Sequence, residues 1–138
     1  MFIFVFVAVA AFLGSMGAKL LADHFLTVRI PIIGSFAGLV HSVNPGISFG
    51  ITLPFQDFLV PLALLLVLIL AWQSARSTLS HIAFGLIAGG AIANIADRFR
   101  DGVVTDFFQV GAFPIFNVAD SCITIGVGLL LVEVMRER

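Results

Sequence analysis

Four long apolar stretches, separated by short polar segments, dominate the hydropathy pattern along the chain. Each approaches the roughly 20 residues that a helix needs to cross the hydrocarbon core of a bilayer. We therefore predict four membrane-spanning helices, over residues of about 1–22, 57–72, 81–97 and 117–135. An even number of spans places both termini, and the polar loop between the second and third spans, on one side of the membrane.

The segment between the first two predicted spans has a different pattern. From residue 25 to residue 55 it alternates β-branched and aromatic residues with Pro and Gly, which is typical of short strands and turns. Backbone outside a helix cannot face lipid, so this segment is expected to lie outside the hydrocarbon region. The predicted fold is an all-α membrane protein: four transmembrane helices with a small extracytoplasmic β-sheet segment between the first and second spans. Residues 1–138 form one domain.

Composition agrees with this class of protein. Of 138 residues, 60% are hydrophobic and 11% are charged, with a mean hydropathy of +1.16, whereas an average soluble domain has roughly 25% charged residues. The net charge of −1 offers no basic face to nucleic acid. One cysteine, Cys122, and three scattered histidines give no metal-ligand spacing. We predict no metal site and no cofactor.

Ionisable residues gather in one short segment near the third and fourth spans. Residues 94–121 contain four of the eight carboxylates, and such groups at membrane depth usually indicate function. Asn94 and Asp97 are three apart and share a helix face, and Asn117 and Asp120 repeat that spacing. Between the two pairs, Asp106 lies on what we predict to be a short loop, which brings it to the membrane level of Asp120.

Structural explanations exist for most of these residues. Asn117 is a good N-cap, and Asp120 then falls in the first helical turn, where the macrodipole favours a carboxylate. Asp101 with the following glycine forms turns readily, and Asp97 beside Arg98 and Arg100 would form an ion-pair cluster. None of these explanations accounts for Asp106 next to two phenylalanines.

Three sequence blocks carry a resemblance to a known family. "GGAIANIADRFRDGVVTDFF", "FNVADS" and "VNPGISFG" resemble the signature blocks of the lipoprotein signal peptidases (type II signal peptidases) in order and spacing. The resemblance implies a catalytic dyad at Asp106 and Asp120. It also implies substrate-binding or dyad-supporting roles for seven further residues: Lys19, Asn44, Gly46, Asn94, Asp97, Arg98 and Asn117.

The chain departs from the family pattern at the end of the first span. The family usually has an aspartate four residues before the lysine, and this chain has Ser15 before Lys19. Asp23 lies at i+4 from Lys19 and is predicted to replace the missing partner.

The resemblance implies a membrane aspartic endopeptidase that needs no cofactor. Its substrate would be a diacylglyceryl-modified prolipoprotein, cut before the lipid-modified cysteine, and globomycin-type inhibitors and membrane lipids would bind. The location implied is the bacterial cytoplasmic (inner) membrane, as a multi-pass protein with its active site toward the extracytoplasmic side.

Two other classes of protein remain open. A small proton-relay or ion-relay subunit also uses paired intramembrane carboxylates, but would spread them over several depths. A catalytically impaired membrane scaffold would keep the fold alone.

Overall fold

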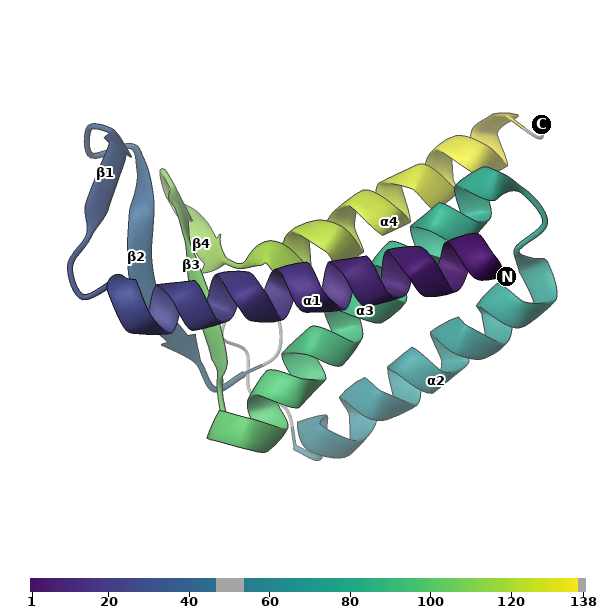
Figure 1. Ribbon diagram of the computed structural model, residues 1–138, viewed down its shortest axis with the longest axis horizontal. Helices are drawn as coiled ribbons and strands as arrows, with labels where there is room; N and C mark the ends of the chain where they lie inside the picture. The colour runs from purple at the N-terminus through teal and green to yellow at the C-terminus, as the bar shows by residue number, and fades with distance from the viewer. Residues whose placement is uncertain (47–53, 137–138) are drawn as a thin grey trace.

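Helices make up most of the molecule, and a small sheet closes one end of it (Figure 1). The structure is a computed structural model that describes residues 1–46 and 54–136. Within these ranges the elements, in chain order, are α1 (Phe2–Phe25), β1 (Ile30–Ile33), β2 (Ala37–Asn44), α2 (Gln56–Ser74), α3 (Thr78–Asp101), β3 (Val104–Val110), β4 (Phe113–Phe116) and α4 (Val118–Arg136). Both termini and the α2–α3 loop lie at the end opposite the sheet (Figure 1).

Three of the helices are long and apolar enough to cross a membrane: α1, α3 and α4. The apolar part of α2, Phe58–Ala71, is shorter, so the fourth span stays a prediction. Helix α3 begins earlier than the predicted residue 81 because Ser77 caps it. The Ser77 hydroxyl accepts the backbone N–H of Ser80 at 2.9 Å, which satisfies one of the free donors of the first turn.

The sheet is antiparallel with strand order β1-β2-β3-β4. Strands β1 and β2 confirm the strands predicted between the first two spans. The prediction of a short loop before the fourth span was wrong, because residues 104–116 form β3 and β4. Strand β3 pairs with β2, placing Asp106 opposite Ser42. This pairing joins segments that lie far apart in sequence, so no local pattern could reveal it.

Helix α3 is the centre of the helical packing, with α1, α2 and α4 all against it. Gly85 and Gly89 were predicted to allow close approach of backbones. A Cβ atom at Gly85 would lie 2.9 Å from the Phe4 carbonyl oxygen of α1, so the absence of side chains here sets the α1–α3 distance. The outward faces of α1 and α4 carry exposed large apolar residues such as Leu13 and Leu131, as a lipid-facing surface requires.

Candidate active site

Asp120 is fixed by the start of α4. Its backbone N–H donates to the Asn117 side-chain oxygen at 2.9 Å, and its own carboxylate accepts the Asn117 backbone N–H at 3.1 Å. This reciprocal arrangement confirms that Asn117 is the N-cap and that Asp120 lies in the first turn. The cap uses only part of each side chain, since the Asn117 amide nitrogen and the second Asp120 oxygen point to other groups.

Two amide side chains connect Asp120 to Asp106. Asn94 of α3 donates to Asp120 Oδ1 at 2.9 Å. Asn117 donates to Asn94 Oδ1 at 3.1 Å and to Asp106 Oδ1 at 2.8 Å. Helix α3, strand β3 and the start of α4 therefore bring together four of the predicted residues in one hydrogen-bonded group.

Asp106 is the buried member of the pair, with 4% of its surface exposed. Burial and, second to it, the neighbouring Asp120 carboxylate raise the pKa of Asp106 to about 6. Both effects act in the same direction because each disfavours a second negative charge in a poorly solvated place. Asp106 thus keeps a proton more readily than an ordinary aspartate does.

The two carboxylates line a cavity of about 620 Å³. Its other walls come from α2, α3, α4 and strand β4, including Val60, Ala91 and Ile125. A cavity of this size suits a peptide segment or a small organic ligand. Its apolar walls lead away from the polar end that carries Asp106 and Asp120.

Asn44 and Arg98 also line this cavity, and both contact Gly46. The Asn44 side chain accepts the Gly46 backbone N–H at 2.9 Å and hydrogen-bonds Asp106. Arg98 donates to the Gly46 carbonyl oxygen. The predicted ion pair between Arg98 and Asp97 was wrong, because Arg98 points toward the Gly46 turn. Residues 47–50, the rest of the "VNPGISFG" block, lie outside the described residues.

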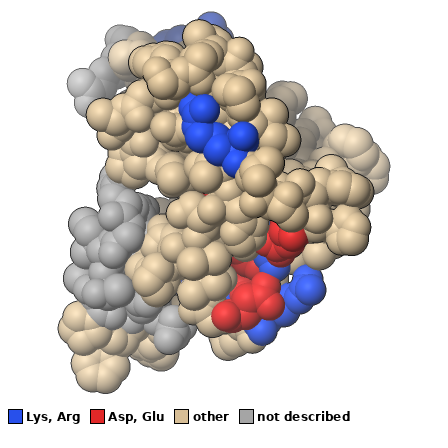
Figure 2. Space-filling model, turned by 90° about the vertical axis from the view of Figure 1, so that its left-hand side faces the viewer, with Lys and Arg blue, Asp and Glu red and all other residues tan. Residues whose placement is uncertain are grey.

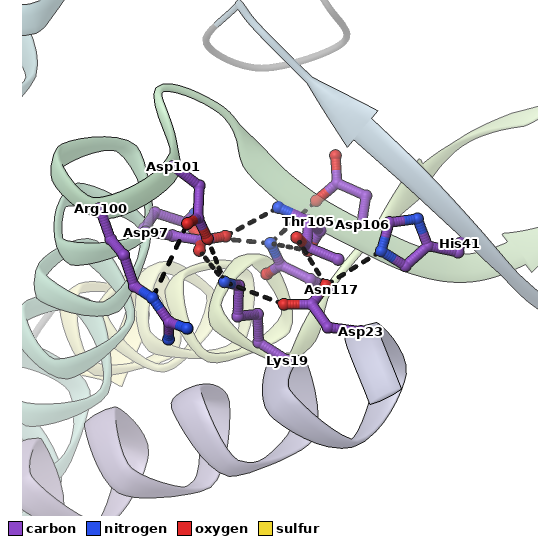
Figure 3. A network of polar contacts seen from close by, with 10 residues as sticks. Lys19, Asp23, His41, Asp97, Arg100, Asp101, Thr105, Asp106 and Asn117 are labelled. Carbon is purple, nitrogen blue, oxygen red and sulfur yellow. Dashed lines mark hydrogen bonds and ion pairs between the residues drawn. The ribbon is translucent and has the colours of Figure 1, made fainter. Parts of the chain in front are cut away.

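A second group of charged residues surrounds Lys19, and we call Lys19, Asp23, Asp97 and Asp101 the lysine cluster (Figure 3). The Lys19 ammonium lies 3.0 Å from Asp23 and 2.8 Å from Asp97, and it donates to Asp101. The prediction that Asp23 pairs with Lys19 in place of the missing first-span aspartate is confirmed by this contact. Asp101 ends α3 before a left-handed Gly102, so it also lies at the predicted turn.

The lysine cluster reaches the surface at the end of the molecule that carries the sheet. Acidic atoms gather there in one place beside basic ones, and a separate basic patch lies elsewhere on the same face (Figure 2). Asp101 and Arg100 contribute an exposed contact of 3.7 Å. His41 of β2 extends the cluster, with its Nε2 atom 2.9 Å from Asp23 Oδ1.

The sequence did not single out His41 or Thr105. Thr105 donates its backbone N–H to Asp97 Oδ2 at 2.8 Å and its hydroxyl to Asp23 at 3.2 Å. A neutral residue that acts through its backbone leaves no signal in the residue type. Among the described residues, no group of three or more His, Cys, Asp or Glu side chains is placed to hold a metal ion.

Comparison with known proteins gives consistent matches. A family model described as "Signal peptidase (SPase) II" matches residues 7–136. A curated relative from Desulforapulum autotrophicum, called "Lipoprotein signal peptidase", is 40% identical over 122 residues, which covers 79% of this chain and 75% of the relative. A relative from Syntrophomonas wolfei with the same name is 42% identical over 103 residues, which covers 72% of this chain and 68% of the relative. A solved structure described as "Bacterial membrane enzyme structure by the in meso method at 1.9 A resolution" superposes with a TM-score of 0.85 at 26% identity, covering 98% of this chain and 94% of that chain.

Proposed function

The chain belongs to the signal peptidase II family, and we propose that Asp106 and Asp120 are the carboxyl groups with which it cleaves its substrate. The protein is a membrane peptidase that removes signal peptides from prolipoproteins. The observation that carries the assignment is the shared environment of the two carboxylates. They line one end of a cavity, they are joined through Asn94 and Asn117, and neither forms a salt bridge with any described residue.

The proposed mechanism needs one carboxylate and one carboxylic acid. Asp106, whose pKa burial raises to about 6, holds the shared proton and hydrogen-bonds the oxygen of the scissile carbonyl. Asp120 is ionised and takes a proton from the attacking water. The oxygen of that water adds to the carbonyl carbon, and the C–N bond breaks as the leaving nitrogen receives a proton from the pair. A pair of carboxyls that shares one proton titrates as a unit.

Support for this pair over other carboxylates comes from the partners that each one has. Asn94 and Asn117 are neutral donors, so they orient the carboxyls without fixing either one in the charged state. Arg98 and Asn44 line the cavity, where their polar groups would bind substrate backbone. These roles, and that of Gly46 in shaping the turn beside Arg98, are part of the proposal.

The substrate we propose is a prolipoprotein whose cysteine already carries a diacylglyceryl group, cut just before that cysteine. The apolar walls of the cavity support this choice, because a peptide with acyl chains needs a site that continues into lipid. Cavity-lining residues on α2 and α4, such as Val60 and Ile125, would then contact the lipid-modified part of the substrate.

The direct test is cleavage of a diacylglyceryl-modified prolipoprotein peptide in detergent. We expect Asp106→Asn and Asp120→Asn each to lose at least about 100-fold in kcat, since general acid or base catalysis contributes roughly 10²–10⁴-fold. Glu133→Gln is the matched control, because Glu133 contacts Ser77 at the opposite end of α4. It should cleave at the wild-type rate. An Asp106→Asn enzyme that is as active as Glu133→Gln would remove Asp106 from the dyad.

We also propose that α2 is a fourth span and that the sheet lies on the extracytoplasmic side of the bacterial cytoplasmic membrane, with residues 1–138 as one domain. Positive charges usually mark the cytoplasmic side, and here Arg76 and Arg136 lie at the terminal end. Of the opposing cations, Lys19, Arg29 and Arg98 are engaged with protein groups, which supports discounting them. Neither a scaffold nor an ion-relay subunit is favoured, because the relatives are named as peptidases.

Sidedness is tested with a cysteine at the α2–α3 loop. Ser77→Cys, in a Cys122→Ala background, should resist a membrane-impermeant thiol reagent in intact cells and react after the cells are opened. Reaction in intact cells would place the sheet on the cytoplasmic side.

Binding of globomycin is tested by thermal unfolding. A ligand at 100 times its Kd adds about 2.7 kcal/mol to the free energy of unfolding, so Tm should rise clearly. Asp106→Asn should show a smaller rise, since the inhibitor is proposed to bind between the dyad carboxyls. An unchanged Tm at saturating globomycin would contradict the inhibitor proposal and leave the peptidase activity in place.

A further inference from the structure

One buried carboxylate connects helix α1 to strand β3. Asp97 is 3% exposed and Lys19 is 4% exposed. One Asp97 oxygen lies 2.8 Å from the Lys19 ammonium, and the other accepts the backbone N–H of Thr105 at 2.8 Å (Figure 3). Asp97 therefore links the Lys19 ammonium of helix α1 to the backbone of β3.

Thr105 immediately precedes Asp106, so its backbone sets where the Asp106 side chain begins. The Thr105 carbonyl oxygen accepts the Asn117 amide at 3.3 Å, and the same amide donates to Asp106 at 2.8 Å. On the other side of the site, Asn94 lies one turn before Asp97 on α3 and holds Asp120. Helix α3 thus holds both carboxyls of the dyad, Asp120 through Asn94 and Asp106 through Asp97.

We propose that Lys19 and Asp97 form a positioning unit that sets the separation of Asp106 from Asp120, a role that rests on the proposed dyad. The Lys19 ammonium, 2.8 Å away, compensates the charge of the buried Asp97 carboxylate. A carboxylate makes a stronger hydrogen bond to an N–H than a neutral acceptor does. Without Lys19 the buried Asp97 carboxylate has no cation beside it, and it should turn away from Thr105 toward water.

The proposal predicts a specific kinetic pattern. Lys19 and Asp97 are absent from the described residues that line the large cavity, so substrate affinity should survive changes in either. A displacement of a catalytic group by about 1 Å can lower the rate by roughly 100-fold. Lys19→Met, which keeps the length of the side chain and removes its charge, should therefore lower kcat by about 100-fold while KM stays close to wild type.

The decisive variant is the double substitution Lys19→Met with Asp97→Asn. An asparagine oxygen at position 97 can still accept the Thr105 N–H, and it needs no cation beside it. The double variant should therefore have a kcat at least about tenfold higher than that of Lys19→Met alone, because the effects of substitutions at residues that act as one unit are not additive. A double variant as slow as or slower than Lys19→Met would overturn the proposal.

Asp101→Asn is the matched control within the lysine cluster. Asp101 binds Lys19 but makes no hydrogen bond or ion pair with β3 among the described residues, so kcat should stay within about twofold of wild type, as expected for a partly exposed ion pair. A loss in Asp101→Asn equal to that in Lys19→Met would show that any loss of charge in the cluster matters, and would refute the specific path through Asp97.

Two further measurements distinguish failure of this proposal from misfolding of a variant and from a wrong assignment of the dyad. If Lys19→Met does not fold, the double variant is used for the test instead, because it buries no unpaired charge at position 97. A folded double variant with a kcat about 100-fold below wild type would refute the proposal. Asp106→Asn is measured in parallel. An active Asp106→Asn enzyme would refute the dyad, whereas an inactive one with an unimpaired Lys19→Met enzyme would refute only the positioning role.

Discussion

Two groups of aspartates lie next to each other at the same end of the molecule, and they differ in what holds them. In the lysine cluster, Asp23, Asp97 and Asp101 all contact the Lys19 ammonium. In the dyad, Asp106 and Asp120 are joined by the neutral amides of Asn94 and Asn117. The same side chain is thus used in one place as a fixed anion and in the other as a group that can exchange a proton.

The difference follows from elementary electrostatics. A cation within hydrogen-bond distance favours the ionised carboxylate, whereas burial beside a second carboxylate favours the protonated form. Asp106, outside the helices, has a pKa raised to about 6 by burial and by Asp120. A proton that can leave near neutral pH is what acid–base catalysis requires. Neutral amide partners are therefore consistent with the proposed role of this pair.

The sharpest way to break this comparison is to place a cation in the dyad. Asn94→Lys introduces an ammonium next to Asp120, where the cavity of about 620 Å³ has room for it. We expect the dyad to become an ion pair that no longer shares a proton, with a loss of about 10²–10⁴-fold in kcat on lipidated substrate. Asn94→Gln, which keeps the amide, is the control and should retain far more activity. Equal activity in the two variants would mean that the charge of the partner is irrelevant.

Three long apolar helices and the closeness of Asp106 to Asp120 could be predicted from sequence, and the lysine cluster only in part. Apolar runs locate α1, α3 and α4 because a bilayer selects length and hydropathy directly. Asp23 could be predicted as a partner of Lys19, since i and i+4 face each other on a helix. Asp97 and Asp101 could not, because they meet Lys19 through the packing of α1 on α3. Their nearest charged neighbours in sequence suggested Arg98 and Arg100.

The sheet shows the same limit. Strands β1 and β2 follow from a local alternation of residue types, but β3 pairs with β2 across a long stretch of chain. Strand β3 reads VTDFFQV, with the polar residues Thr105, Asp106 and Gln109 at irregular spacing, so it lacks the alternation that usually predicts a strand. The adjacent polar residues Thr105 and Asp106 interrupt any alternation in β3, and this hides the strand from a local pattern.

Removing the charge of Asp106 should stabilise the protein at alkaline pH. The pKa of Asp106 is about 6 in the folded protein against an ordinary 3.8, so between these pH values the folded state binds more protons than the unfolded state. The free energy of unfolding then falls as pH rises from about 4 to about 6 and is constant above, a loss of at most about 3 kcal/mol. Asp106→Asn escapes this loss.

The measurement is thermal unfolding in detergent at pH 4 and pH 8. Asp106→Asn should have a higher Tm than wild type at pH 8 and nearly the same Tm at pH 4, although it is inactive at both. A variant less stable than wild type at pH 8 would show that the charged form of Asp106 is well solvated in the fold.

Adding a carboxylate to the lysine cluster should cost stability. Ser15 is buried on α1, one turn before Lys19, so Ser15→Asp places a fourth carboxylate around one ammonium. We expect a loss of about 1–3 kcal/mol, typical of an uncompensated buried charge. Adding Asp23→Asn to Ser15→Asp should recover most of this loss, because the number of carboxylates returns to three. Urea unfolding in detergent measures both variants, and a Ser15→Asp protein more stable than wild type would mean that Lys19 has unused capacity.

The smallest effect on stability is expected at the solvent-exposed edge of the lysine cluster. His41 is about one-third exposed and lies 2.9 Å from Asp23, so water competes with the contact and salt screens it. His41→Ala should lower the free energy of unfolding by less than about 1 kcal/mol, as for other exposed pairs, and the difference should shrink at high salt. Activity should stay near wild type, because Asp23 keeps Lys19 as a partner. A large loss of kcat in His41→Ala would mean that β2 also helps to position Asp106, through the contact between Asp23 and Thr105. The positioning unit would then extend beyond α1 and α3.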